Sequence, residues 1–335
     1  DQQRRRERLN TPVGGLPGIR SSEIVGDRAD IETQALFIQD EWRATDALTL
    51  TLGARQYRVS SELLASDRTT EGRVDRADDH LIAALSAVYA GPDRSLWRMN
   101  LSQGYVYPSL MQVATGAFAG SSFVNPNIDL KPETSDNLEL GWRYNLDGWH
   151  ADVALFYSRA KDYIDHVSCA AGETCLGVSR RDRIYRNVAR YSSRGVELNL
   201  EKPLGALTPY VNATWMRRDN RYRDFATRDS GWPALSGRLG VRRSWALENT
   251  QLWMDLYARA ESAADEATPA GAGIERKHKG GWSTFNLALG TEFGGQRQYR
   301  LTTELLNLGD KHYASAMENL TAPGRSVRIK FSLSL

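Results

Sequence analysis

The sequence predicts an all-β protein, a transmembrane antiparallel β-barrel to which this chain contributes about thirteen C-terminal strands. Apolar and polar side chains alternate with a period of two along most of the chain, which indicates strands with one apolar face. The connections between these strands alternate between short and long. No apolar run approaches the roughly 20 residues that a spanning helix needs. The mean hydropathy of −0.50 still permits a barrel, because only alternate residues of its strands face lipid.

The last strand shows the alternation most clearly. From Val327 to Leu335 every odd position is apolar, and Arg328 and Lys330 occupy the opposite face. We therefore expect the odd positions to face lipid, since a charge at the bilayer midplane costs roughly 2–4 kcal/mol. Similar patterns predict strands at 31–43, 47–61, 79–90, 95–106, 134–145, 149–160, 185–202, 206–218, 232–246, 250–262, 281–293, 297–308 and 321–335.

The connections predict how this barrel is oriented. Membrane barrels have short periplasmic turns and long extracellular loops. The short connections are 44–46, 91–94, 145–148, 203–205, 247–249 and 294–296, and the long ones are 62–78, 107–133, 161–184, 219–231, 263–280 and 309–320. Counting back from a last strand that ends in the periplasm places residues 1–30 in an extracellular loop. An odd number of strands, where single-chain bacterial barrels have an even number, predicts that the chain begins partway round a larger barrel.

Composition and motifs argue against other classes of function. The net charge of +2 gives no electrostatic reason to expect a nucleic-acid partner. Nucleophile elbows, zinc-protease motifs and phosphate-binding loops are missing from the sequence, and its five histidines are scattered. We therefore expect neither catalytic residues, nor a resident metal, nor a cofactor. Cys169 and Cys175 are predicted to form a local extracellular disulfide, because a zinc site would need partners and only His166 stands beside them.

Several motifs together resemble a known family. The segment from Asn307 to Tyr313 matches N-L-x-D-x-x-Y, and Pro323–Arg325 supplies the P-G-R that follows it. Asn125–Ser135 resembles an N-P-(N/D)-L-x-P-E-T-S box, and Phe37–Trp42 resembles an F-x-Q-D-E-W strand. A further stretch resembles Y-x-N-V…R-G-V-E, at Tyr185–Val188 and Arg194–Glu197. The chain is thereby identified as similar to the C-terminal barrel of TonB-dependent outer-membrane receptors of the iron-siderophore or haem type. The terminal Leu335 departs from the pattern, because an aromatic residue is usual there.

The resemblance implies most of the functional expectations. Family members have a barrel of roughly 22 strands filled by an N-terminal plug, and a short N-terminal segment binds TonB. Both are expected to be missing from this chain. The implied location is the outer membrane, in contact with lipid and lipopolysaccharide. The implied function is active uptake of an iron complex, with a ferric siderophore favoured over haem. Two alternative functions stay open: uptake of a cobalamin, a saccharide or another metal chelate, and, less favoured, passive diffusion through a porin.

The ligand site is predicted in the long loops. Haem receptors of the family carry a Phe-Arg-Ala-Pro box and a loop histidine, whereas this chain has Tyr105–Ser109 followed by a loop without histidine at 110–124. Ferric chelates are often anionic and flat, which favours aromatic and cationic contacts. Tyr105 and Tyr107 are either iron ligands or interfacial anchors, and the arginines either bind the chelate or meet lipopolysaccharide phosphates. The candidate ligand-binding residues are Tyr105, Tyr107, Phe118, Phe123, Arg217, Arg218, Arg221 and Arg223.

Overall fold

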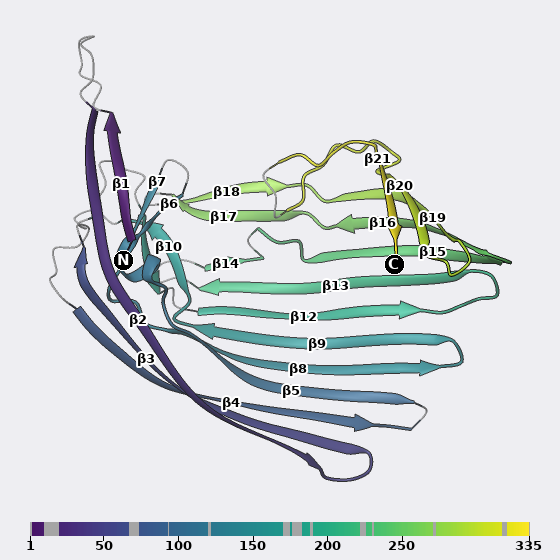
Figure 1. Ribbon diagram of the computed structural model, residues 1–335, viewed down its shortest axis with the longest axis horizontal. Coiled ribbons are helices and arrows are strands. Elements are labelled where there is room, and N and C mark those ends of the chain that lie inside the picture. The colour runs from purple at the N-terminus through teal and green to yellow at the C-terminus, as the bar shows by residue number, and fades with distance from the viewer. Residues whose placement is uncertain are drawn as a thin grey trace.

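The computed structural model describes residues 2–9, 20–66, 74–92, 94–119, 122–169, 175, 183–187, 190–221, 226–229, 231–270, 273–316 and 320–334. One large, curved antiparallel sheet dominates these residues (Figure 1). Its strands follow one another in sequence order, each bonded to its neighbour. They are β1 (Gln2–Leu9), β2 (Arg20–Arg43), β3 (Leu48–Ser66), β4 (Val74–Ala90), β5 (Ser95–Val106), β8 (Glu133–Leu146), β9 (Trp149–Lys161), β12 (Arg190–Glu201), β13 (Thr208–Arg221), β15 (Leu235–Leu247), β16 (Thr250–Glu261), β19 (Trp282–Phe293), β20 (Tyr299–Leu306) and β21 (Ser326–Leu333), with β14 (Ala226–Arg228) beside β13.

The thirteen predicted strands correspond to β2 through β21 of this sheet, so the predicted meander is confirmed. Several predicted boundaries need correction. The loop predicted at 62–78 is shorter, because β3 runs to Ser66 and β4 begins at Val74, and the last strand begins at Ser326 where 321 was predicted. The segment 185–202 divides, because β11 (Arg183–Asn187) leaves the main sheet before β12 begins. The expected loop at 1–30 contains β1 and the first part of β2, paired from Gln2 with Asp27 to Leu9 with Arg20. This charged hairpin lacks the apolar alternation by which the other strands were recognised. Its extracellular location stays a prediction.

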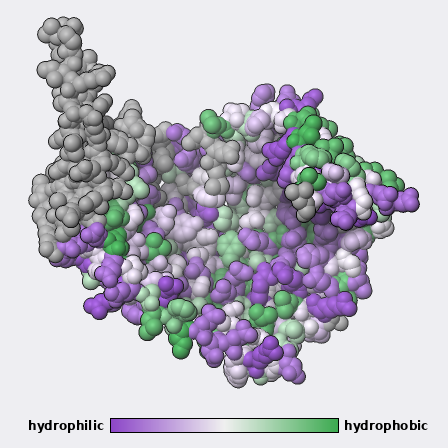
Figure 2. Space-filling model, in the orientation of Figure 1, coloured by the Kyte–Doolittle hydropathy of each residue, from purple (hydrophilic) through white to green (hydrophobic). Residues whose placement is uncertain are grey.

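The two faces of the sheet differ in polarity, as the alternation requires. On β21, Val327 and Ile329 are 61% and 68% exposed on the outer face. Arg328, between them, donates to Glu304 Oε2 at 3.2 Å on the inner face. Figure 2 shows hydrophobic residues gathered at the right-hand edge, over β19 to β21, and mainly hydrophilic or neutral residues around the central hollow. The outer face is therefore suited to lipid and the inner face to a wet lumen.

Short connections join the strands at one end and long ones at the other (Figure 1). Two of these turns have only two residues, and in the one between β8 and β9 both residues, Asp147 and Gly148, have positive φ, 52° and 77°. Such a two-residue turn matches the right-handed twist of the strands that it joins. The predicted alternation of connection lengths is confirmed, and at the left-hand end of β9, β12 and β13 in Figure 1 the chain passes into long connections.

The long connections carry structure of their own. A four-stranded sheet combines β10 (Ile164–Ser168), β11, β7 (Ser122–Asn125) and β6 (Ala117–Ala119), and β17 (Ala264–Ala270) pairs with β18 (Gly273–Lys279). The π-helix η1 (Met111–Thr115) precedes β6. In the described ranges no helix is long and apolar enough to cross a membrane, a criterion that does not apply to strands.

A small core lies on the inner face of β13, β16 and β19. It contains Tyr210, Tyr257 and Ala288, with Trp253 packed against it. The Trp253 ring lies across Gly290, where an added Cβ would come within 2.1 Å of ring carbon Cε2. Glycine is therefore required for the ring to lie flat on the wall. This packing holds large inward side chains close to the sheet and leaves the lumen open.

Candidate functional site

The long connections touch one another around the mouth of the barrel. The loop between β5 and β8 pairs with the loop between β9 and β12 through β7 and β11. From there β10 contacts β17, and Gly231 N–H donates to Asp265 O at 3.0 Å. Lys279 Nζ then donates to Ala316 O at 2.8 Å in the loop before β21. These contacts join the described loops into one continuous rim.

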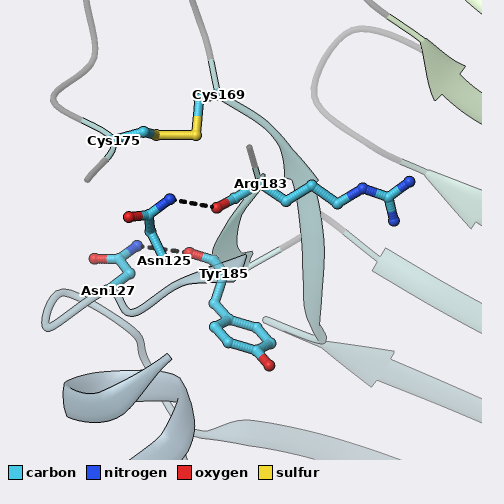
Figure 3. The surroundings of a disulfide bond; sticks show 6 residues. All are labelled: Asn125, Asn127, Cys169, Cys175, Arg183 and Tyr185. Carbon is cyan, nitrogen blue, oxygen red and sulfur yellow. Dashed lines mark hydrogen bonds between the residues drawn. A yellow bond between two sulfur atoms is a disulfide. The ribbon is translucent and has the colours of Figure 1, made fainter. Parts of the chain in front are cut away.

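Two sequence motifs meet inside this rim. Asn125 Nδ2 donates to Arg183 O, and Asn127 Nδ2 donates to Tyr185 O, both at 2.9 Å (Figure 3). Asn187 completes the contact, because its Oδ1 accepts from Lys131 N–H at 2.8 Å and its Nδ2 donates to Lys131 O at 2.9 Å. We call these three asparagines the asparagine clasp. It gives the motif residues a physical role, because they bind two loops together.

The clasp and the loops around it form a small core above the barrel wall. Val124 is 1% exposed, Phe123 5% and Asn125 3%. Gly116, at a φ of 63°, lies so close that a Cβ would approach the Phe123 ring within 2.6 Å. Phe123, a predicted ligand contact, is therefore part of this core. Phe118 lies in β6 and pairs through its backbone with Phe123.

The predicted cysteines are joined beside the clasp. Cys169 follows β10 directly, and a disulfide links it to Cys175 with the Cα atoms 6.5 Å apart (Figure 3). Seven residues form this ring, so the bond constrains only the end of the β10–β11 hairpin. It adds local order to the same loop that the clasp holds.

The hydroxyl groups of the two candidate tyrosines form hydrogen bonds with side chains of the barrel wall. Tyr105 donates to Asp78 Oδ2 at 2.7 Å and stacks on His80, with the ring centroids 4.7 Å apart. The Tyr107 hydroxyl lies 2.7 Å from Ser61 Oγ. Both phenol oxygens are thus engaged by β3 and β4, an arrangement that suits anchors of the loop start better than iron ligands.

The candidate arginines do not form one cluster. Arg217 and Arg218 are consecutive in β13, so their side chains lie on opposite faces of the sheet. Arg218 shares the inner face with Tyr210 and stacks on Trp232, its guanidinium carbon 3.5 Å from the ring centroid. Arg217 lies on the outer face, as does Arg221 at the end of the strand. Arg223 lies outside the described residues.

A group of aromatic residues surrounds Arg218. Tyr163 stacks on Tyr191 with the ring centroids 5.8 Å apart. Burial, with the nearby carboxylates Asp165 and Glu133, raises the pKa of the Tyr163 phenol, and Arg218 opposes this rise. We call Tyr163, Tyr191, Arg218 and Trp232 the mouth cluster. Sequence reasoning missed its two tyrosines, although Tyr163 follows β9 closely and Tyr191 lies at the start of β12, on either side of a long loop.

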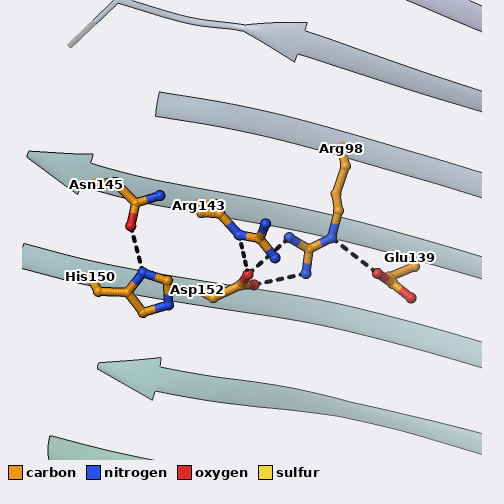
Figure 4. A network of polar contacts seen from close by, with 6 residues as sticks. All are labelled: Arg98, Glu139, Arg143, Asn145, His150 and Asp152. Carbon is orange, nitrogen blue, oxygen red and sulfur yellow. Dashed lines mark hydrogen bonds and ion pairs between the residues drawn. The ribbon is translucent and has the colours of Figure 1, made fainter. Parts of the chain in front are cut away.

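Below the mouth, the inner wall has a concavity of about 600 Å³. Arg98 Nη2 lies 2.8 Å from Asp152 Oδ1, Arg143 Nε lies 2.7 Å from Asp152 Oδ2, and Glu139 approaches Arg98 at 3.4 Å (Figure 4). On the opposite side, Arg238, Arg259, Glu261 and Trp282 line it. The concavity is therefore lined by cations and carboxylates that ion pairs hold in place. Within the described ranges, no three His, Cys, Asp or Glu side chains gather as a metal site would require.

Comparison with known proteins supplies the family. The family model described as "TonB dependent receptor-like, beta-barrel" matches residues 2–308. The chain is 29% identical to the ferrienterobactin receptor of Escherichia coli strain K12 over 244 residues, which cover 72% of this chain and 30% of that receptor. It is 24% identical to the ferric enterobactin receptor PirA of Pseudomonas aeruginosa, over 98% of this chain and 46% of that receptor. The chain spans less than half the length of these curated relatives.

Solved structures share the fold. The copper transporter OprC has a TM-score of 0.77 at 17% identity, over 99% of this chain and 52% of that one. The unliganded ferric citrate transporter FecA has a TM-score of 0.67 at 16% identity, over 96% and 48%. At such identities the likeness shows the fold alone. With the family match over residues 2–308, it follows that this chain belongs to the TonB-dependent receptor β-barrels, a family of transport receptors of the outer membrane.

Proposed function

We propose that the full-length receptor containing this chain takes up a ferric siderophore across the outer membrane, with energy delivered through TonB. TonB would bind an N-terminal region that precedes the barrel in the family. The names of two curated relatives, which describe receptors of ferric enterobactin, support an iron chelate as cargo. The mouth cluster is the observation in this chain that carries the proposal.

The mouth cluster has the chemistry that a ferric chelate requires. Tyr163 is 41% exposed, so one face of a flat aromatic ring is open to a ligand. Arg218 supplies positive charge beside it, and its stacking on Trp232 holds the guanidinium in place. Charge at a concave mouth raises the local concentration of an anionic ligand and therefore its association rate. Ferric siderophores are often anionic and have flat aromatic or planar chelating groups.

The proposal revises the role of the predicted ligand residues. Arg218 remains a ligand contact. Tyr105 and Tyr107 become anchors of the loop start, and Phe123 becomes a core residue of the rim. Arg217 is assigned to the lipid-facing side of the sheet by its register. The cargo passes from the mouth cluster to the charged concavity around Asp152, which is wide enough to hold part of a chelate.

The test is uptake of radioactive iron by cells that lack other siderophore receptors and carry the full-length gene. We expect uptake of at least one chelate class among catecholate, hydroxamate and citrate, and loss of that uptake when TonB is deleted. Arg218→Ser and Trp232→Ala should each reduce binding, whereas the matched control Arg217→Ser, one residue away on the other face, should not. Uptake of haem alone would overturn the siderophore assignment. Uptake that persists without TonB would indicate a passive pore.

A further inference from the structure

The apolar outer face of the sheet contains two charged side chains near its short-turn end. On β2, Asp40 pairs in register with Leu52, which is 53% exposed on the outer face. On β15, Arg243 shares a face with Leu239, which lies four residues before it and is 63% exposed. Among the first three outward positions of each main-sheet strand from β2 to β21, counted from the short-turn end, no other charged residue occurs in the described part of the chain. Charged residues in membrane-spanning segments are rare and usually pair with one another.

Neither charge has a partner among the residues that the structure describes. Asp40 and Arg243 form no ion pair there, and the Nε of Arg243 is buried without a hydrogen-bond acceptor. The guanidinium carbon of Arg243 lies 4.8 Å from the ring centroid of Trp245, which holds the side chain against the wall. The two charges cannot reach each other, because seven strands of the main sheet lie between β2 and β15, which separates them by roughly 38 Å along the sheet. A partner for each charge must therefore come from outside the described sheet.

The two charges lie at the same depth in the membrane. Both β2 and β15 run toward a short turn, and in each strand a tryptophan follows the charge two residues later on the same face. These tryptophans are Trp42 and Trp245, and tryptophan is typical of the boundary between membrane and water. Each charge therefore lies one outward position inside that boundary. Because one membrane holds two receptors parallel and at one depth, Asp40 of one copy can meet Arg243 of another.

We propose that the outer face binds a second copy of the same receptor, with Asp40 of one copy paired with Arg243 of the next. Apolar surfaces gain little from contact inside a membrane, because lipid tails are as apolar as leucine, so polar groups supply much of the attraction. The two charges lie more than a third of the way round a barrel of about 22 strands. One contact between two copies therefore uses one charge of each, and the contact repeats head to tail into a cluster. Both residues lie outside the lumen, so the inference does not rest on the proposed siderophore uptake.

The test measures Förster energy transfer between donor-labelled and acceptor-labelled full-length receptors in vesicles of phosphatidylcholine, a lipid without net charge. Asp40→Arg and Arg243→Asp should each lower the association constant roughly tenfold, because each sets like charges against each other. A mixture of these two variants should associate as the unchanged receptor does, because the reversed charges then face each other. The matched controls Asp79→Arg and Arg217→Asp reverse the same charges on the outer face nearer the long loops, and should leave the transfer unchanged.

The double variant Asp40→Arg, Arg243→Asp separates a lost ion pair from lost folding. It should associate with itself as the unchanged receptor does, because each contact regains opposite charges. Equal transfer in all variants would overturn the proposal. A loss in Asp40→Arg alone, with Arg243→Asp unaffected, would also overturn it, by showing that Asp40 pairs within its own barrel. A mixture of the two single variants that stays dissociated would overturn it as well, because the contact would then depend on something other than this pair.

Discussion

The asparagine clasp makes a prediction that can be followed at a single amide. Asn187 forms three hydrogen bonds: it accepts from Lys131 N–H, and its Nδ2 donates to Lys131 O and to Asp162 O. Asn187→Ala removes all three and leaves the peptide group of Lys131 without this partner. The change should loosen the loop before β8 from the loop before β12, while the strands of the barrel stay paired.

The expected size follows from these bonds. A hydrogen bond contributes about 1 kcal/mol net, and Asn187 is half-buried, so the loss is about 2–3 kcal/mol in the free energy of local opening. Since 1.4 kcal/mol is a factor of ten, hydrogen exchange of the Lys131 amide should accelerate by roughly 30- to 150-fold. That amide is itself the donor to Asn187 Oδ1, so it reports directly on the clasp.

The assay is hydrogen exchange with mass spectrometry on the full-length receptor in lipid nanodiscs. Asn199→Ala is the matched control, because it removes one asparagine that accepts from Asn212 at 2.7 Å on the wall and should not affect the loop. Asn187→Asp keeps the acceptor for Lys131 N–H, but its carboxylate would face the carbonyl oxygens of Lys131 and Asp162 without a proton to donate. Only at low pH, where the carboxyl group is protonated and can donate, should exchange of the Lys131 amide accelerate less than in the alanine variant. Unchanged exchange at Lys131 in Asn187→Ala would refute the structural role of the clasp.

Three further predictions concern the wall and the rim. Asp255→Ala should lower the free energy of unfolding by about 3 kcal/mol, because it leaves the Arg238 guanidinium, 2.6 Å away, unpaired; equal urea midpoints in detergent would contradict this. Burial raises the pKa of Tyr163 above its ordinary value of 10.0, so the stability that it contributes is complete below pH 10 and is lost as pH rises through the raised pKa. Tyr163→Phe should therefore remove a late component from the phenolate absorbance titration, and an identical titration would count against this environment. Replacing Cys169 and Cys175 by serine should lower local stability by about 2 kcal/mol, measured as faster proteolysis of the β10–β11 hairpin, with the unfolding midpoint of the barrel unchanged. A large shift in that midpoint would show that the ring constrains more than the loop.

The strands were predictable because a period of two is a local property. Segment 134–145, for example, became β8 (Glu133–Leu146), and both faces of β21 follow from the alternation of Val327 with Arg328. The same rule also shows why the predicted arginines could not all face the lumen. Arg217 and Arg218 are adjacent in a predicted strand, so only one of them can face the lumen. The hairpin of β1 and β2 escaped prediction because its charged residues show no apolar face.

The rim was beyond local reasoning. The parallel contact between β7 and β11 joins residues almost sixty positions apart, and no spacing within either loop indicates it. The motifs at Asn125 and Asn187 were recognised separately, each as a family signature. Only the fold shows that their side-chain amides bind the opposite loop, and that Tyr191 comes next to Tyr163. Non-local contacts of this kind depend on the path of the whole barrel.

The asparagine clasp also defines which parts of such receptors can be exchanged. A chimera that takes the loop before β8 from another receptor brings its own partners for Asn187, while the loop before β12 keeps the old ones. Unless both loops are transplanted together, the side-chain amides of one loop lose the backbone groups of the other loop with which they form hydrogen bonds. Ligand specificity in this part of the mouth should therefore be inherited as a pair of loops, and recombination that respects the pair will preserve folding where single-loop exchange will not.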